Sequence, residues 1–125
     1  MEGPVKQFSL DALEAAPGIG LIRLKGAMAK WDIDILGLAV DKFVAHRIYR
    51  IVIDLGETTH VASAAIGTFL SIHDRMAKQR GKLVLATVGP TISSIFSRLG
   101  FQDMFVTAAD VPSAVRMLTD GAVAP

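Results

Sequence analysis

The sequence predicts an α/β fold: a single domain with a mixed, mostly parallel central sheet of about five strands and about four helices. The chain has 125 residues, a length that suits one domain, and its 51% apolar content is enough for a core. Short apolar runs typical of strands alternate with segments of helical periodicity. This alternation favours parallel strands joined by crossover helices. We therefore expect residues 1–125 to form one domain, with its core over about residues 5–120.

The N-terminal third predicts a hairpin followed by a helix. Phe8 and Leu10 alternate as in a strand, and the run 19–25 predicts a second strand that ends at Gly26. From about residue 30 to 45 the pattern becomes helical, so we expect a helix there. The residues that follow the helical spacing are Trp31, Ile35, Leu38, Ala39, Lys42 and Phe43.

The middle of the chain predicts the centre of the sheet. The run 48–55 is nearly continuously apolar and β-branched, which is typical of a strand covered on both faces. We expect a polar loop over residues 56–60, and then a helix with an apolar stripe from residue 66 to 77 that stops at Gly81. His73 lies on this stripe, which predicts a partly buried packing residue.

The C-terminal third repeats the strand and helix alternation. A buried strand is expected over residues 82–88, followed by a helix that begins at Gly89-Pro90 and stops at Gly100. A short last strand is expected at residues 105–106. Asp110 then suits the N-cap of a last helix, because a carboxylate there can accept hydrogen bonds from the first amides.

Charge and composition exclude several classes of function. Thirteen Lys and Arg against twelve Asp and Glu give a net charge of +1, which offers no electrostatic footprint for nucleic acid. The chain has no cysteine, so it has no disulfide framework and no cysteine-ligated metal. No run approaches the roughly 18 apolar residues of a membrane helix, and residues 1–6 lack a secretion signal. We expect a soluble, cytoplasmic protein without membrane insertion.

No constellation of catalytic residues or cofactor loop is evident. The Gly-x-Gly of residues 18–20 precedes a strand, so it predicts a turn and not a phosphate loop. His46, His60 and His73 lack metal-ligand spacing, and Ser63 lacks the surroundings of a hydrolase nucleophile. The expectation is a protein that is not an enzyme and has no metal and no cofactor.

Ser63 stands between the predicted central strand and the next helix, at the carboxyl edge of a parallel sheet. Ligands and partners usually bind at this edge. The hydroxyl suits an N-cap, because it can accept a hydrogen bond from an amide two or three residues on. It also suits phosphorylation, since a phosphate there faces the positive end of the helix dipole. The two roles are compatible, and local physics leaves both open.

The run 52–67, which reads VIDLGETTHVASAAIG, resembles the signature of STAS domains, a family that includes bacterial anti-sigma-factor antagonists. Later segments fit the family in order: 81–85 resembles its Gly-x-Leu-x-Leu strand, 89–90 and 99–101 the start and end of the next helix, and Phe105 the closing segment. The resemblance covers about residues 5–120 and implies the STAS fold. Within the signature, the matching residues are Asp54, Leu55, Val61, Ser63, Ile66 and Gly67.

The resemblance also implies partner switching. In the family, the serine at the position of Ser63 is commonly phosphorylated by an anti-sigma kinase and dephosphorylated by a phosphatase. The dephosphorylated antagonist binds the anti-sigma factor and frees the sigma factor. The resemblance thus implies a cytoplasmic bacterial regulator of transcription whose protein partners are an anti-sigma factor with serine kinase activity and a phosphatase. The partner-binding positions that it implies are Gly26, Ala27, Met28, Ala29, His60, Val61, Ala62, Ser63, Ala64, Ala65 and Gly67.

The chain departs from the family pattern at this surface. Ala62 replaces the family's aspartate, Ala64 and Ala65 replace a serine and a glycine, and residues 26–29 lack its glutamate and aspartate. The surface becomes less acidic and more apolar, so its small residues either form one exposed patch for a protein partner or pack against each other. The residues concerned are Ala27, Met28, Ala29, Val61, Ala62, Ala64 and Ala65.

Two alternatives follow from these departures. The loss of acidic residues favours a constitutive STAS scaffold subunit of a stress-sensing or lipid-transport assembly. The helix N-terminus at Ser63 also suits a domain that senses a nucleotide or another anion. The same apolar face allows a homodimer.

Overall fold

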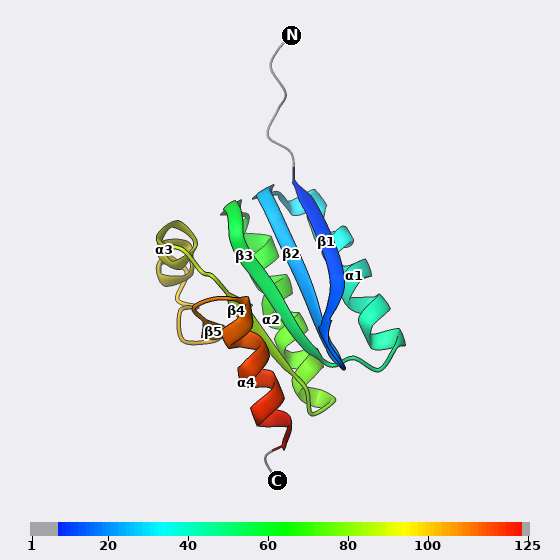
Figure 1. The fold of residues 1–125 in the computed structure, drawn as a ribbon. Coiled ribbons are helices and arrows are strands. Elements are labelled where there is room, and N and C mark those ends of the chain that lie inside the picture. Colours follow the sequence, from blue (N-terminus) through cyan, green and yellow to red (C-terminus); the bar gives the residue numbers. More distant parts are fainter. Residues whose placement is uncertain (1–7, 124–125) are drawn as a thin grey trace.

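The sheet has five strands in the order β1-β2-β3-β4-β5, with β1 antiparallel to β2 and the other pairs parallel (Figure 1). The computed structural model describes residues 8–123, with side chains through Thr119, so the predicted core boundary at residue 5 lies outside it. The α/β fold class with five strands and four helices is confirmed. The elements are β1 (Ser9–Ala16), β2 (Ile19–Met28), the 3-10 turn η1 (Lys30–Asp32), α1 (Ile33–Ala45), β3 (Arg50–Val61), α2 (Ser63–Lys78), β4 (Lys82–Ala86), α3 (Pro90–Arg98), β5 (Val106–Ala108) and α4 (Val111–Val123).

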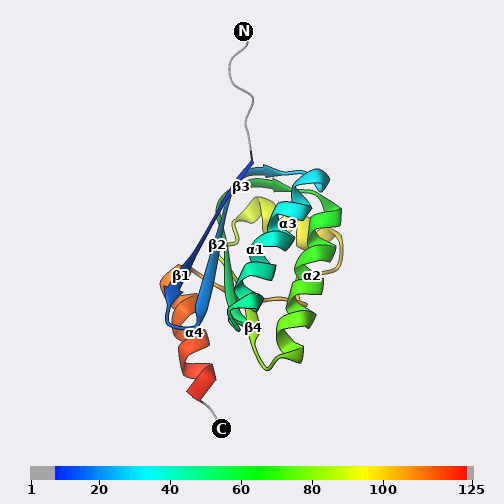
Figure 2. The same cartoon turned by 90° about the vertical axis from the view of Figure 1, so that its right-hand side faces the viewer.

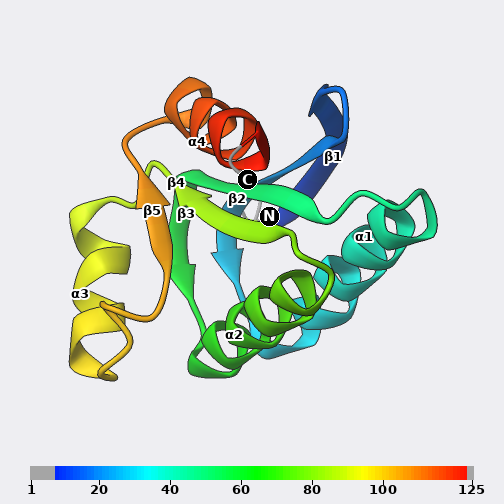
Figure 3. The same cartoon turned by 90° about the horizontal axis from the view of Figure 1, so that it is seen from below.

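Helices cover both faces of the sheet, but unequally. Helices α1, α2 and α3 lie on one face and α4 lies on the other (Figures 2 and 3). Successive residues of a strand point to opposite faces, so Ile22 and Leu24 of β2 join the larger core under three helices. Ile19 and Leu21 join the smaller core under α4. Burial on both sides explains why the central strands read as continuous apolar runs.

Strands β2 and β3 are longer than the sequence predicted. The expected end of the second strand at Gly26 and the expected loop over residues 56–60 are both wrong, because β2 continues to Met28 and β3 to Val61. The two strands stay paired, although their register shifts beside Gly26, whose φ of 87° suits only glycine well. This part of the strand was not predicted because its register is irregular and its exposed polar side chains are typical of a loop.

The helix predicted over about residues 30–45 is present as η1 and α1, but several residues that showed its spacing lie at the surface. Trp31, Ile35 and Leu38 are 74%, 47% and 63% exposed. Apolar residues occupy more than one side of this helix, and the spacing alone did not show which side faces the sheet. The side chains of α1 that are buried are Leu36, Ala39, Val40 and Phe43.

The residue that ends α2 was also misplaced. The left-handed residue after this helix is Arg80 (φ 61°), although Gly81 was the predicted stop. Gly81 serves close packing instead, because a Cβ there would overlap the carbonyl oxygen of Tyr49. The stop predicted for α3 is confirmed, since Gly100 has a φ of 80° and the Phe101 amide donates to the Phe96 carbonyl at 2.8 Å.

Two smaller predictions are confirmed. The turn at Gly18 (φ 78°) joins β1 to β2. Asp110 caps α4, because its Oδ1 accepts a hydrogen bond from the Ser113 amide at 2.8 Å. Among the helices within residues 8–123, none is long and apolar enough to cross a membrane.

Candidate functional site

The structure brings together the two segments that the sequence singled out. β2 and β3 end side by side, with Ala27 opposite His60 and Met28 opposite Val61. Just beyond, the Ala62 amide donates a hydrogen bond to the Met28 carbonyl at 3.0 Å. We call residues 26–31 and 60–67 together the Ser63 surface. It lies at the carboxyl edge of the sheet, near the top of Figure 1.

Ser63 is exposed and is the first residue of α2. The N-cap is Ala62, whose φ and ψ of −66° and 149° are extended, and no side chain caps the helix. The N-cap role predicted for Ser63 is therefore wrong by one position. Its hydroxyl lies in the first turn of the helix, near the amides that create the positive end of the dipole.

The small residues of the Ser63 surface do not form one exposed patch. Met28, Val61 and Ala65 are almost fully buried in the larger core. Fewer residues remain at the surface: beside Ser63, the exposed ones are His60, Ala64 and Gly67. Three alanines, Ala27, Ala29 and Ala62, are half-buried, whereas Gly26 is buried. For Met28, Val61 and Ala65, packing is therefore the correct alternative.

Trp31 is a residue of this surface that was not among the partner-binding positions predicted from the sequence. It lies in η1, the turn that begins directly after Ala29, and its side chain is 74% exposed. Asp32 holds the turn in place, because its Oδ2 accepts a hydrogen bond from the Ala29 amide at 2.8 Å. The one sequence signal for exposure is that Trp31 falls outside the helical repeat formed by Leu36 and Phe43.

Asp54, which matches the family signature, has a structural role. Its Oδ2 accepts from Nε of Arg23 across the β2–β3 pair at 3.0 Å, and its Oδ1 accepts from the Gly56 amide at 3.0 Å. The aspartate thus holds β3 at the point where its register with β2 begins to shift. Asp54 helps to carry the strand toward Ser63 without belonging to the exposed surface.

Charge is sparse on the Ser63 surface. Residues 26–31 and 60–67 contain no carboxylate of their own, and Lys30 and His60 are their ionisable residues, but the Asp32 carboxylate accepts a hydrogen bond from the Ala29 amide at their border. Within residues 8–119, no three His, Asp or Glu side chains gather in a way that could hold a metal ion. His73 packs away from this surface, with its ring edge-on to Phe105 at 6.5 Å, which confirms its predicted packing role.

Comparisons with known proteins agree with the fold. The family model described as STAS domain matches residues 12–114. An anti-sigma factor antagonist from Mycobacterium paratuberculosis has a similar structure, with a TM-score of 0.78 and 18% identity over 91% of this chain and 96% of that one. No curated protein sequence matches the chain.

Two further solved structures share the fold. The Bacillus cell fate determinant SpoIIAA, in its phosphorylated form, has a TM-score of 0.69 and 14% identity, over 87% of this chain and 99% of that one. A sulfate transporter family protein from Wolinella succinogenes has a TM-score of 0.72 and 12% identity, over 86% of this chain and 89% of that one. At these identities the likeness concerns the fold.

Proposed function

This chain belongs to the STAS domain family, and from that premise we propose that it is a non-catalytic regulatory binding module, an anti-sigma-factor antagonist that works by partner switching in the cytoplasm. Its unphosphorylated Ser63 surface binds an anti-sigma factor and so frees a sigma factor. Phosphorylation of Ser63 by that partner ends the complex, and a phosphatase restores it. The observation that carries the proposal is the exposed position of Ser63 at the first residue of α2.

The electrostatics of the surface support Ser63 as the phosphorylation site. A phosphate at the first turn faces the positive end of the helix dipole, so the fold tolerates it. It adds a charge of about −1.5 to −2. Because residues 26–31 and 60–67 contain no carboxylate and Asp32 stands only at their border, this phosphate would add a large negative charge to the surface. Repulsion and desolvation at a nearly neutral interface then weaken the complex.

The shape of the surface supports a protein partner. Ala64 and Gly67 leave room in front of α2, and a Cβ added at Gly67 would meet no heavy atom within 4 Å. Trp31 lies in η1, which is in contact with α2, and its side chain is 74% exposed. Exposed tryptophans that become buried on binding commonly supply much of the affinity of an interface. We assign Trp31 as an anchor for the partner.

Intact mass measurement after incubation with the cognate kinase and ATP tests the switch. The expected result is one added phosphate on the wild type and none on Ser63→Ala. Ser71→Ala is the matched control, because Ser71 is exposed on the same helix outside the Ser63 surface. Phosphate that persists in Ser63→Ala would exclude Ser63 as the acceptor.

A scaffold role is the second candidate. Ala62 stands where the family has an aspartate, and one structural neighbour comes from a sulfate transporter family protein. A scaffold would bind its partner constitutively, whatever the charge at Ser63. If Ser63→Asp lowers partner capture in a pull-down, switching is supported. If capture is unchanged, the scaffold role is supported.

A further inference from the structure

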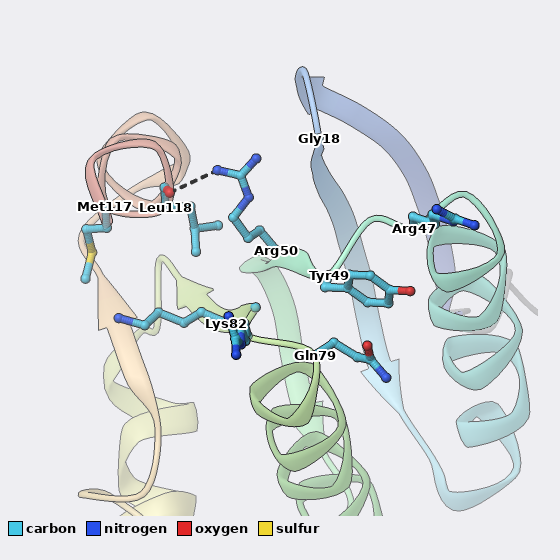
Figure 4. Close-up of a pocket in the computed structure, with 10 residues that line it drawn as sticks. Gly18, Arg47, Tyr49, Arg50, Gln79, Lys82, Met117 and Leu118 are labelled. Atoms are coloured by element: carbon cyan, nitrogen blue, oxygen red, sulfur yellow. Dashed lines mark hydrogen bonds between the residues drawn. The ribbon is translucent and has the colours of Figure 1, made fainter. Parts of the chain in front are cut away.

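A pocket of about 310 Å³ opens at the end of the sheet opposite the Ser63 surface (Figure 4). It lies where β3 and β4 begin, where α1 and α2 end, and against Met117 and Leu118 of α4. Ligands of open parallel sheets usually bind at the carboxyl ends of the strands. The pocket is at the amino ends, so fold analogy does not account for it.

The pocket gathers positive charge. The described side chains that line it include Arg47, Arg50, Arg80 and Lys82, and no carboxylate is among them. These four are a large share of the 13 basic residues of a chain whose net charge is only +1. Outside the lining, Glu14 bonds the Gly18 amide at 2.8 Å, at the turn next to Arg50. A pocket lined by cations and by no carboxylate favours an anionic ligand.

Two of the cations come from neighbouring strands and share a direction. Arg50 of β3 is opposite Lys82 of β4 in the parallel register, so both side chains project to the same face of the sheet. Nη1 of Arg50 donates a hydrogen bond to the Leu118 carbonyl at 3.2 Å, drawn as the dashed line in Figure 4. This bond fixes the guanidinium beside α4, at the side of the pocket that Lys82 also lines.

The other two cations occupy backbone positions where glycine is more stable. Arg47 and Arg80 have φ values of 60° and 61°, each just after the last turn of its helix. Both helices end with a common C-terminal hydrogen-bond pattern. The Ile48 amide donates to the Phe43 carbonyl at 2.9 Å, and the Gly81 amide donates to the Met76 carbonyl at 2.8 Å. A left-handed residue with a side chain costs stability compared with glycine.

Helix α3 does not line the pocket. It ends with the same hydrogen-bond pattern, but Gly100 occupies its left-handed position. The two helix ends that line the pocket carry arginine instead. The left-handed conformation alone does not mark the site, because Thr87 (φ 60°) also adopts it outside the lining. A cation near a helix C-terminus is favoured by the helix dipole, and at Arg47 and Arg80 the same cation also lines the pocket, where it can meet an anion.

We infer that this pocket binds a small organic diphosphate. Planar guanidinium groups can hold phosphate oxygens through paired hydrogen bonds, and four cations suit a ligand with more than one phosphate charge. The Tyr49 ring and Met117 add apolar surface for the carbon part of the ligand. The volume corresponds to a small molecule. This site is separate from the Ser63 surface and does not depend on the proposed switch.

Titration calorimetry of the full chain with pyrophosphate, at fixed ionic strength, tests the inference. We expect pyrophosphate to bind at least about tenfold more tightly than inorganic phosphate, because more cations are engaged. Arg80→Gln and Arg47→Gln should each weaken binding at least about fivefold. Arg98→Gln is the control, since Arg98 is an exposed cation at the end of α3 outside the pocket. It should leave the affinity unchanged.

The glycine variants separate recognition from structure. Arg47→Gly and Arg80→Gly should weaken pyrophosphate binding and yet raise the thermal unfolding midpoint of the free protein, because glycine relieves the left-handed conformation. An absence of pyrophosphate binding by the wild type, or an equal loss in Arg98→Gln, would overturn the inference. Binding to phosphatidylglycerol vesicles that pyrophosphate does not displace would also overturn it, in favour of a lipid headgroup.

Discussion

The backbone of Ala62 is tied to that of Met28 by a hydrogen bond of 3.0 Å, one residue before α2 begins. This bond joins two segments that are more than thirty positions apart in the sequence. It fixes the extended conformation of Ala62 and so sets the point at which the helix can start. The location of Ser63 at the first helical position follows from this constraint and not from capping by its own hydroxyl.

The missing cap at Ala62 makes a prediction about stability. Ala62→Ser should raise the free energy of unfolding by about 1 kcal/mol, because a serine hydroxyl there can accept from an amide of the first turn. Ser63→Ala should change it by less than about 0.5 kcal/mol, since Ser63 is exposed and does not cap. Urea denaturation measures both. The opposite order, with a loss in Ser63→Ala and no gain in Ala62→Ser, would place the cap at Ser63.

Trp31 should matter for binding and hardly for folding. Trp31→Ala should leave the unfolding midpoint nearly unchanged, because the side chain is 74% exposed. If the ring anchors the proposed anti-sigma partner, the affinity of Trp31→Ala for that partner should fall about 30-fold, which corresponds to about 2 kcal/mol. Leu38→Ala is the matched control on α1, at 63% exposure and outside the Ser63 surface. Surface plasmon resonance that shows equal affinities for both variants would rule out the anchor role.

Gly81 should tolerate no side chain. Gly81→Ala should lower the free energy of unfolding by more than about 3 kcal/mol, because the new Cβ would overlap the Tyr49 carbonyl at the start of the parallel β3–β4 pair. Gly37→Ala is the control: nothing lies within 4 Å of a Cβ at this position in α1. There alanine should stabilise the helix by about 0.5–1 kcal/mol. Calorimetric unfolding of the two variants should therefore shift in opposite directions.

Asp110 should make the stability of α4 depend on pH. Hydrogen bonds from the Ser113 hydroxyl and amide hold the pKa of this carboxyl below its ordinary value. The charged form is thus favoured in the folded state, so its contribution is present at neutral pH and is lost as the pH falls through the folded pKa. We expect the stability advantage of the wild type over Asp110→Asn to shrink below about pH 4. Asp103→Asn controls for the lost charge alone.

The parts of the fold that the sequence predicted best are those in which local and long-range signals agree. Within the run 48–55, Ile51, Val52, Ile53 and Leu55 are buried as predicted, and Gly100 and Asp110 occupy the helix ends that these residue types favour. The errors arise where tertiary contacts outweigh local preference. Gly26 continues a strand because pairing with Thr58 holds it there, and Gly81 follows the helix stop because Tyr49 leaves no room for a side chain.

The candidate site was predicted in position but not in its exposed composition. Asp54 lies in the predicted central strand, and Ser63 lies at the start of the following helix, one position after the N-cap. The rotation of α2 against the sheet decides which of its small residues point outward. In this structure Ala65 is buried and Ala64 is exposed. Trp31 was missed for the same reason, because spacing shows that a helix has an apolar side but not which side the sheet covers.

Strand β3 runs from Arg50 to Val61, so it begins at the cationic pocket and ends beside Ser63. A strand of 12 residues spans roughly 35 Å. A small anion at one end and a protein at the other would therefore meet no steric conflict. The proposed anion and the proposed protein partner could therefore bind to the same chain at the same time, at opposite ends of one strand.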